Sequence, residues 1–253
     1  MSTIPRVLSI VTLILLWVIL STIFPSTIVP GPVPVMKAIW QNLQSGQAFI
    51  HIYKTLLRVG LGLVLTMILG VAAGTVMGLY RKGEAFLDAW VTVGLTVPAT
   101  VSSIICLMWF GLNDRAAIVA IGLSAFPTVA ISIWQGIKGI DTQLVGMANA
   151  FHIPKRAIVR KIIFPQLVPH ILGAMRYALG ICWKICTTVE LIGMSSGVGY
   201  MMSYWFGLFS MTQVFAWTLS FLLVMFAIEY LLFKPVEKRL TRWRAGAPVP
   251  LGV

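Results

Sequence analysis

Six long apolar stretches constrain this chain more than any other feature of its sequence. A helix that crosses a membrane needs about 20 mostly apolar residues to span roughly 30 Å of hydrocarbon. Only helices and closed barrels satisfy every backbone polar group there, and the chain lacks the alternating strands of a barrel. The sequence therefore predicts an all-α integral membrane protein with about six transmembrane helices. The predicted spans are residues 7–24, 56–80, 87–111, 116–136, 170–192 and 212–233.

The composition agrees with this prediction. Hydrophobic residues make up 58% of the 253 residues and charged residues only 10%, whereas soluble domains carry about 25% charged residues. A net charge of +12 would suggest nucleic-acid binding if the basic residues shared one folded face. Here they lie between the apolar stretches, so we expect no nucleic-acid partner and interpret the charge as a signal of membrane topology.

The reactive side chains do not form a catalytic or metal-binding pattern. The three cysteines lie inside apolar stretches, without the spacing of a metal site. Seven acidic residues are scattered along the chain, and His51, His152 and His170 are isolated from one another. The sequence also lacks a G-x-x-x-x-G-K-[ST] phosphate loop. We therefore expect no enzymatic activity, metal or cofactor in this chain. It is then either a transport subunit of a larger complex or, as the alternative, a channel or secondary transporter that works without an ATPase.

Lysine and arginine near the ends of spans predict the orientation, because these residues are retained on the cytoplasmic side. With the N-terminus inside, most of them lie in the cytoplasm, as do both termini and the tail 234–253. Residues 25–55 then lie outside, with a short interfacial helix over 35–43. The predicted cytoplasmic cations are Arg6, Arg81, Lys82, Lys138, Lys155, Arg156, Arg160, Lys161, Lys234, Lys238, Arg239, Arg242 and Arg244, against Lys37, Lys54, Arg58 and Arg115 outside.

Glycine and proline shape two of the spans. Gly70, Gly74 and Gly78 recur at every fourth residue, which leaves a groove where another helix can approach closely. We expect this groove to serve packing within one subunit rather than a homodimer contact. Pro98 removes a helical hydrogen bond and is expected to kink its span.

The loop 137–169 is the longest predicted cytoplasmic segment, and it is interpreted as two helices. Asp141 is a candidate N-cap, and an apolar stripe follows it at helical spacing. Pro154 can open a second, basic helix that ends near Pro165 and Pro169. Either the stripe folds back onto its own spans while the cations face lipid phosphates, or it binds a partner protein. The stripe consists of Leu144, Met147, Ala148 and Phe151.

This loop resembles the cytoplasmic signature of bacterial ABC importer permeases, which is EAA, three residues, G, nine residues and I-x-L-P. Gly146-Met147-Ala148 stands at the EAA positions, His152 stands at the glycine, and Ile162-Ile163-Phe164-Pro165 stands at I-x-L-P. Gly146, Met147 and His152 depart from the signature.

Further motifs make the chain similar to nitrate, sulfonate and taurine importer permeases along nearly its whole length. They include T-L-x-R, G-x-x-x-G-x-x-x-G, W-F-G, L-G-x-x-W, E-L-I-G and G-L-G-Y. Their counterparts here are Thr55 to Arg58, Gly70 to Gly78, Trp109 to Gly111, Leu179 to Trp183, Glu190 to Gly193, and Gly197 to Tyr200, with Pro30-Gly31-Pro32 at an L-P-S-P element and Ile104 where a proline is common.

The resemblance implies a type I ABC importer permease in the bacterial inner membrane, a single permease domain over 1–253 with its five-helix core at 56–233. Two permease copies would line a central pathway. A separate ATPase dimer would hold the ATP and Mg and would dock under the loop 137–169, and a substrate-binding protein would deliver the solute. The residues expected to couple to the ATPase are Leu144, Gly146, Met147, Ala148, Phe151, His152 and Pro154.

Charged residues in the fifth span mark the candidates for the solute pathway, because a charge at mid-bilayer costs about 2.5–3.5 kcal/mol unless it faces protein or water. Lys184, Thr188 and Glu190 are these candidates, whereas Arg176 is expected to snorkel toward the cytoplasm. Lys184 either attracts an anionic solute or pairs with Glu190 or Glu229. Glu190 is expected to be a structural or gate-lining group.

Overall fold

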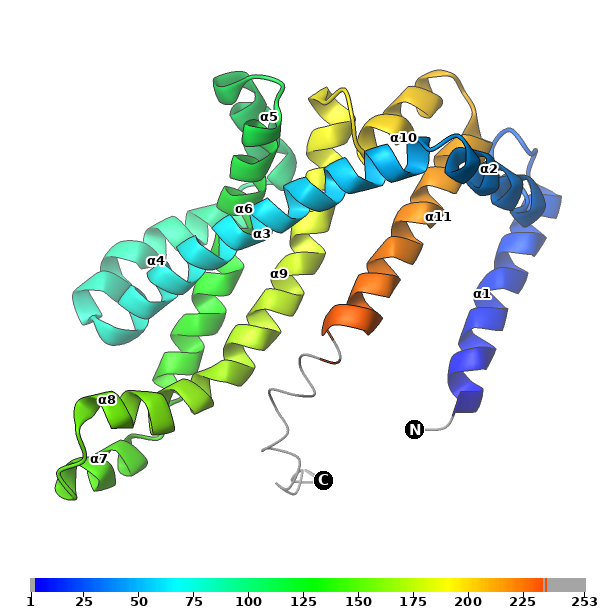
Figure 1. Ribbon diagram of the computed structural model, residues 1–253. Helices are drawn as coiled ribbons and strands as arrows, with labels where there is room; N and C mark the ends of the chain where they lie inside the picture. The colour runs from blue at the N-terminus through cyan, green and yellow to red at the C-terminus, as the bar shows by residue number, and fades with distance from the viewer. Residues whose placement is uncertain (1–2, 234, 236–253) are drawn as a thin grey trace. The chain divides into compact units, whose positions relative to one another are not determined.

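The computed structural model describes residues 3–233 and 235, and each regular element in them is a helix, as predicted (Figure 1). The predicted cytoplasmic tail 234–253 otherwise lies outside the described residues. The elements are α1 (Thr3–Ile23), α2 (Pro32–Gln44), α3 (Gln47–Leu79), α4 (Arg81–Thr96), α5 (Ala99–Phe110), α6 (Asp114–Lys138), α7 (Thr142–Ala150), α8 (Lys155–Ile158), the π-helical turn η1 (Val159–Ile163), α9 (Phe164–Gly193), α10 (Val198–Gly207), α11 (Met211–Ile228) and the π-helical turn η2 (Glu229–Phe233).

Each predicted span falls on an apolar helix. In the described residues, four helices are long and apolar enough to cross a membrane: α3, α6, the continuous helix Lys155–Gly193, and Met211–Leu231. The pair α4 and α5 passes the same test as one bent unit. Helix α1 contributes a shorter apolar segment, Leu8–Ile23, where the first span is predicted.

Two helices extend past their predicted bounds. Helix α3 begins at Gln47, inside the segment 25–55 that we expected outside the membrane, because the break in the chain is at Gly46, with φ of +75°. The basic helix after Pro154 does not end near Pro165 or Pro169, since α8, η1 and α9 form one helix of 39 residues. The π-helical turn ends two residues before Pro165, and this proline has no N–H for a regular helical bond.

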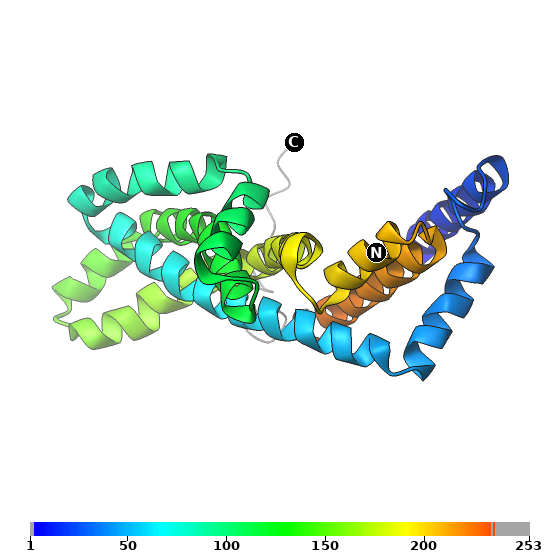
Figure 2. The ribbon, with the colours of Figure 1, turned by 90° about the horizontal axis from the view of Figure 1, so that it is seen from above.

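The chain divides into two compact units, and each is described by itself. The first comprises residues Met1–Leu57 and Thr187–Phe226. In it, the short helix predicted over 35–43 is confirmed as α2, which packs Val35 and Ile39 against Ala216 of α11. Helices α10 and α11 lie side by side in both views, around Met201 and the fully buried Trp217 (Figures 1 and 2).

The second unit, Arg58–Cys186 and Ala227–Val253, is built on close packing of α3 against α6. A Cβ at Gly70 would lie 2.5 Å from Cβ of Val129, and one at Gly74 would lie 2.5 Å from the backbone oxygen of Ala130. Gly62 and Gly78 meet α6 in the same way, at Ile121 and Ile137. The predicted glycine groove therefore packs against a helix of the same subunit.

The contacts between α3 and α6 also determine their direction. Residue numbers rise together along both helices, from Gly62 beside Ile121 to Gly78 beside Ile137, so the helices run parallel. A chain that leaves α3 and enters a parallel α6 must cross back in between. The α4–α5 pair is therefore a broken span, and it packs on α6 along both of its halves.

The break between α4 and α5 is at the predicted proline. The two helices meet at 98°, Pro98 is the N-cap of α5, and Val97 before it is extended with ψ of 123°. A residue before proline is pushed out of the helical region by the proline ring, which explains why the helix stops there.

The groove predicts different effects for two glycines of α3. Gly74→Ala is expected to destabilise the protein by about 1–3 kcal/mol, because the backbone of α6 cannot move aside. Gly60→Ala, where no atom lies within 4 Å of the added Cβ, is expected to be neutral or to stabilise by up to about 1 kcal/mol. Thermal unfolding in detergent followed by circular dichroism measures both, and equal melting temperatures for the two variants would contradict the packing.

Candidate functional site

The predicted docking loop begins with a well-capped helix. The Asp141 carboxylate accepts hydrogen bonds from the backbone N–H groups of Gln143 at 2.8 Å and Leu144 at 3.2 Å, which confirms the predicted N-cap of α7. The backbone N–H of Asp141 donates to the side chain of Gln166 at 3.0 Å. Because Gln166 belongs to α9, this bond ties the start of α7 to the base of a spanning helix.

Most of the apolar stripe on α7 is uncovered. Leu144 is 43% exposed, Met147 54% and Phe151 75%, whereas Ala148 is buried. Gly146 is exposed, with no atom within 4 Å of an added Cβ. The stripe therefore does not fold back onto the chain's own spans, apart from Ala148.

His152 ends α7 in a left-handed conformation, with φ of +55°. Its N–H donates to the carbonyl of Asn149 at 2.9 Å, and the N–H of Ile153 donates to that of Ala148 at 3.0 Å. This pair of bonds is a Schellman cap, a motif that favours glycine. Histidine at this position costs about 1–2 kcal/mol of backbone strain, which explains why the resembling permeases have glycine there.

Pro154 begins the next helix as its N-cap, as predicted, and Ile158 of that helix is buried. The chain then continues without interruption through η1 into α9. The segment that follows the cap of α7 is therefore part of the same helix as the spanning segment of α9.

Of the predicted pathway residues, Lys184 lies on an uncovered face of α9. Its neighbours Cys182, Trp183, Ile185 and Cys186 are all buried, while Lys184 itself is exposed. Thr188 follows one turn later and is half-buried.

Arg176 is not merely a snorkelling residue, since it forms an ion pair with Glu229 of η2. This contact joins α9 to the end of the last described helix within the second unit. Glu229 is also one of the two carboxylates that we considered as partners of Lys184.

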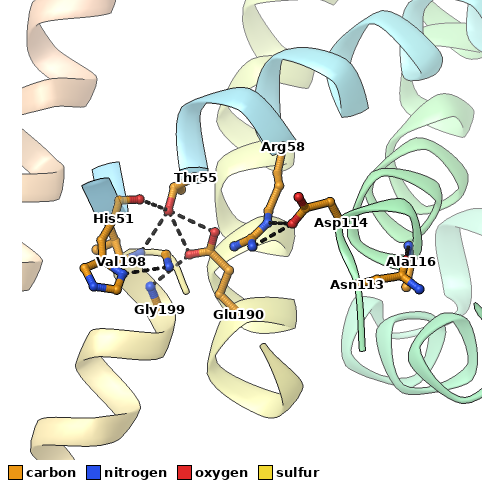
Figure 3. A network of polar contacts seen from close by, with 10 residues as sticks. His51, Thr55, Arg58, Asn113, Asp114, Ala116, Glu190, Val198 and Gly199 are labelled. Carbon is orange, nitrogen blue, oxygen red and sulfur yellow. Dashed lines mark hydrogen bonds and ion pairs between the residues drawn. The ribbon is translucent and has the colours of Figure 1, made fainter. Parts of the chain in front are cut away.

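Glu190 is at the centre of a buried polar network in the first unit (Figure 3). Its side chain is only 1% exposed. Thr55 Oγ1 donates a hydrogen bond to the carboxylate and lies 2.9 Å from each of its two oxygens. The carboxylate also accepts the backbone N–H of Gly199 at 3.0 Å. Of the two uses expected for Glu190, this geometry favours the structural one.

The network caps helix α10 through three consecutive backbone N–H groups. Gly197 donates to His51 Nδ1 at 3.1 Å, Val198 donates to Thr55 Oγ1 at 2.9 Å, and Gly199 donates to Glu190 (Figure 3). The free N–H groups of a helix start need such partners where water is scarce, and a carboxylate there is also favoured by the helix dipole. A Cβ at Gly197 or Gly199 would collide with Glu190, so glycine is required at both positions.

Arg58 supplies a second buried charge, in the second unit. Its guanidinium donates from Nε at 2.8 Å and from a terminal nitrogen at 2.7 Å to Asp114 Oδ1 at the start of α6, and the residue is 1% exposed (Figure 3). Sequence reasoning matched Thr55 and Arg58 to a motif and counted Arg58 among the outside cations, but it placed neither in a site, and it missed His51 and Asp114 as their partners. The signal that could have indicated the pair was a cation inside an apolar stretch, Arg58, together with an acid between two later predicted spans, Asp114.

The three cysteines are buried, and none of them forms a disulfide. Within the described ranges, no group of three or more histidine, cysteine or acidic side chains is placed to hold a metal ion.

The α10 cap predicts the effect of removing one hydroxyl. Thr55→Val is nearly isosteric but leaves the Val198 N–H unbonded and removes a donor to Glu190, so it is expected to destabilise the protein by about 1–3 kcal/mol. Thr12→Val, which removes a hydroxyl that donates to the Leu8 carbonyl within its own helix, is the matched control. Thermal unfolding in detergent should show a clear loss only for Thr55→Val; a loss of the same size in the control would contradict the role of the network.

Comparison with known proteins agrees with this geometry. Residues 66–242 match the family described as binding-protein-dependent transport system inner membrane component. A protein named as an aliphatic sulfonates transport permease of Bacillus subtilis (strain 168) is 31% identical over 219 residues, covering 87% of this chain and 79% of that protein. The taurine transport system permease protein of Escherichia coli (strain K12) is 28% identical over 219 residues, covering 85% and 75%.

A solved structure shares the fold. The inward-facing MetNI methionine ABC transporter matches with a TM-score of 0.65, covering 76% of this chain and 95% of the solved chain at 18% identity. The all-helical architecture is therefore that of a type I ABC importer permease, as expected. Because the matched family region makes up more than half of the chain and includes the end of α3 that packs on α6, α6 itself, the loop between α6 and α9, and α10, this protein belongs to the family of binding-protein-dependent transport system inner membrane components.

Proposed function

We propose that this chain and a second copy of it form the membrane pathway of an ATP-driven importer for a small anionic solute. The observation that carries the proposal is the exposed stripe of Leu144, Met147 and Phe151 on α7, in a chain of an importer permease family. Apolar side chains on a water-facing helix need a partner surface. A separate ATPase subunit with a cleft for this helix is the partner that gives the stripe a function.

The construction of α7 suits force transmission. Its start is fixed by the Asp141 cap and by the bond to Gln166, and its end is fixed by the Schellman turn at His152. The start is therefore hydrogen-bonded to α9, and the end is followed, after Pro154, by the continuous helix Lys155–Gly193. Rocking of the ATPase can then tilt these helices as rigid bodies.

The orientation follows from the same partners. Docking to an ATPase places the α7 loop in the cytoplasm, and with it both termini. The ATP and Mg are held by the ATPase dimer, and a substrate-binding protein delivers the solute from the opposite side. Under this arrangement the chain is a transport component and the hydrolytic chemistry belongs to its partner.

The solute class is inferred from Lys184 together with the relatives. The ammonium group lies on the uncovered face of α9, where a charge is stable only against water, protein or solute. Two relatives are named for sulfonate-bearing solutes, aliphatic sulfonates and taurine. A cation on the pathway favours an anionic group over a neutral one, and Thr188 offers a hydroxyl one turn away.

The docking proposal predicts loss of coupling for Phe151→Ala. Truncating an exposed aromatic anchor typically costs 2 kcal/mol or more of binding, roughly 30-fold in affinity. We expect co-purification with the ATPase and ATP-driven uptake in proteoliposomes to fall at least ten-fold. Phe86→Ala, at an equally exposed phenylalanine of α4, is the control and should leave both unchanged. Uptake that proceeds without any ATPase would overturn the proposed function in favour of a secondary transporter.

The solute proposal predicts a charge-dependent effect at Lys184. Lys184→Gln should lower the rate of uptake of an anionic sulfonate several-fold in the reconstituted complex, while Lys184→Arg, which keeps the charge, should retain most of it. Basal ATP hydrolysis serves as the assembly control for both variants, because neither substitution changes the exposed surface of α7. Unchanged affinity and rate for the anion in Lys184→Gln would exclude Lys184 from the pathway and leave the importer function intact.

A further inference from the structure

A dense basic patch lies directly after the docking helix. Lys155, Arg156, Arg160 and Lys161, on α8 and η1, are all exposed. In the part of the chain that the structure describes, none of the four forms an ion pair with a carboxylate. We refer to these four residues as the basic patch.

The local sequence gives the patch no counter-charge. Between Asp141 and Glu190 the chain contains no acidic residue, and both of these acids are engaged, Asp141 as the cap of α7 and Glu190 in the network around α10. Like charges four residues apart on a helix, such as Arg156 and Arg160, destabilise it. Lys155 and Arg156 also lie in the first turn of this helix, where the helix dipole is positive, which adds to the cost. An external anion would offset this repulsion.

The patch is also placed at the edge of the hydrophobic span. The helix continues from Lys155 to Gly193 without a break, and Ile162, Ile163 and Phe164 follow the last cation immediately. Val159 and Phe164 are exposed between and beside the cations. Apolar groups interleaved with long basic side chains are typical of the boundary between acyl chains and headgroups, where lysine and arginine reach up to phosphate.

We propose that the basic patch is a binding site for the headgroups of anionic phospholipids at the cytoplasmic membrane surface. An acidic protein surface would satisfy the charges but would leave Val159 and Phe164 facing water, whereas a lipid accepts both. Arg160 and Lys161 belong to the π-helical turn η1, so a bound headgroup contacts the segment that joins the α7 loop to α9. The proposal concerns this chain alone and does not depend on the proposed transport function.

The test titrates the purified full chain in neutral detergent with phosphatidylglycerol and, in parallel, with phosphatidylcholine, and counts bound lipids by native mass spectrometry. The wild-type chain is expected to bind the anionic lipid at least ten-fold more tightly than the zwitterionic one. Each cation removed should reduce this preference about five-fold, because a basic residue near an anionic surface contributes about 1 kcal/mol. Arg160→Gln with Lys161→Gln is the first variant, and the fourfold glutamine variant is the second.

Two controls keep the result interpretable. The charge-preserving variant, with lysine and arginine exchanged at all four positions, should retain the preference, and so should Arg81→Gln with Lys82→Gln, which removes two cations near Glu84 and Asp88 of α4. Raising the salt concentration should weaken binding in the wild type.

Three results would overturn the proposal: equal affinity of the wild type for both lipids, an undiminished preference in the glutamine variants, or an equal loss in the Arg81 and Lys82 control. If the glutamine variants keep the lipid preference but no longer retain an ATPase subunit, the patch is a protein contact instead. The doubly substituted variant covers the case in which the fourfold variant does not fold.

Discussion

The close contact between α3 and α6 is the constraint on which the second unit depends. Van der Waals packing holds helices together in lipid, because the surrounding acyl chains are as apolar as the side chains. Glycines allow α3 to approach the backbone of α6 within contact distance, and the same residue offset recurs from Gly62 to Gly78. Two parallel helices in contact force the chain between them to return across the membrane, and the break at Pro98 divides this return into α4 and α5.

The first unit is organised by hydrogen bonds instead. Helix α10 begins where its N–H groups have little access to water, and His51, Thr55 and Glu190 accept three of them in succession. A buried carboxylate is expensive in an apolar environment, and the hydroxyl and amide donors around Glu190 offset that cost. The charge is thus used to fasten a short helix to two spanning helices. This use explains a carboxylate inside a membrane span without any role in catalysis.

The docking loop shows how a degenerate signature can preserve a structure. The cap by Asp141 and the Schellman turn at His152 are both formed, although histidine replaces glycine in a left-handed conformation. Gly146, where glutamate is usual, has no close neighbour, so its replacement removes no packing contact within this chain. The backbone geometry of the loop is therefore kept, while the surface that it presents to a partner is changed at Gly146 and Met147.

The sequence by itself determined the fold class, the approximate position of each apolar helix, the α2 helix, the Asp141 cap and the break at Pro98, because the length of apolar stretches, helical periodicity and the restrictions of proline act locally. It also placed the glycine groove of α3 but not its partner helix. The continuity of α8, η1 and α9 through two prolines was not predictable, since a π-helical turn absorbs the missing N–H only in the context of the whole helix. The pairs Thr55–Glu190 and Arg58–Asp114 join residues far apart in the chain, and only tertiary structure decides which buried charge meets which donor.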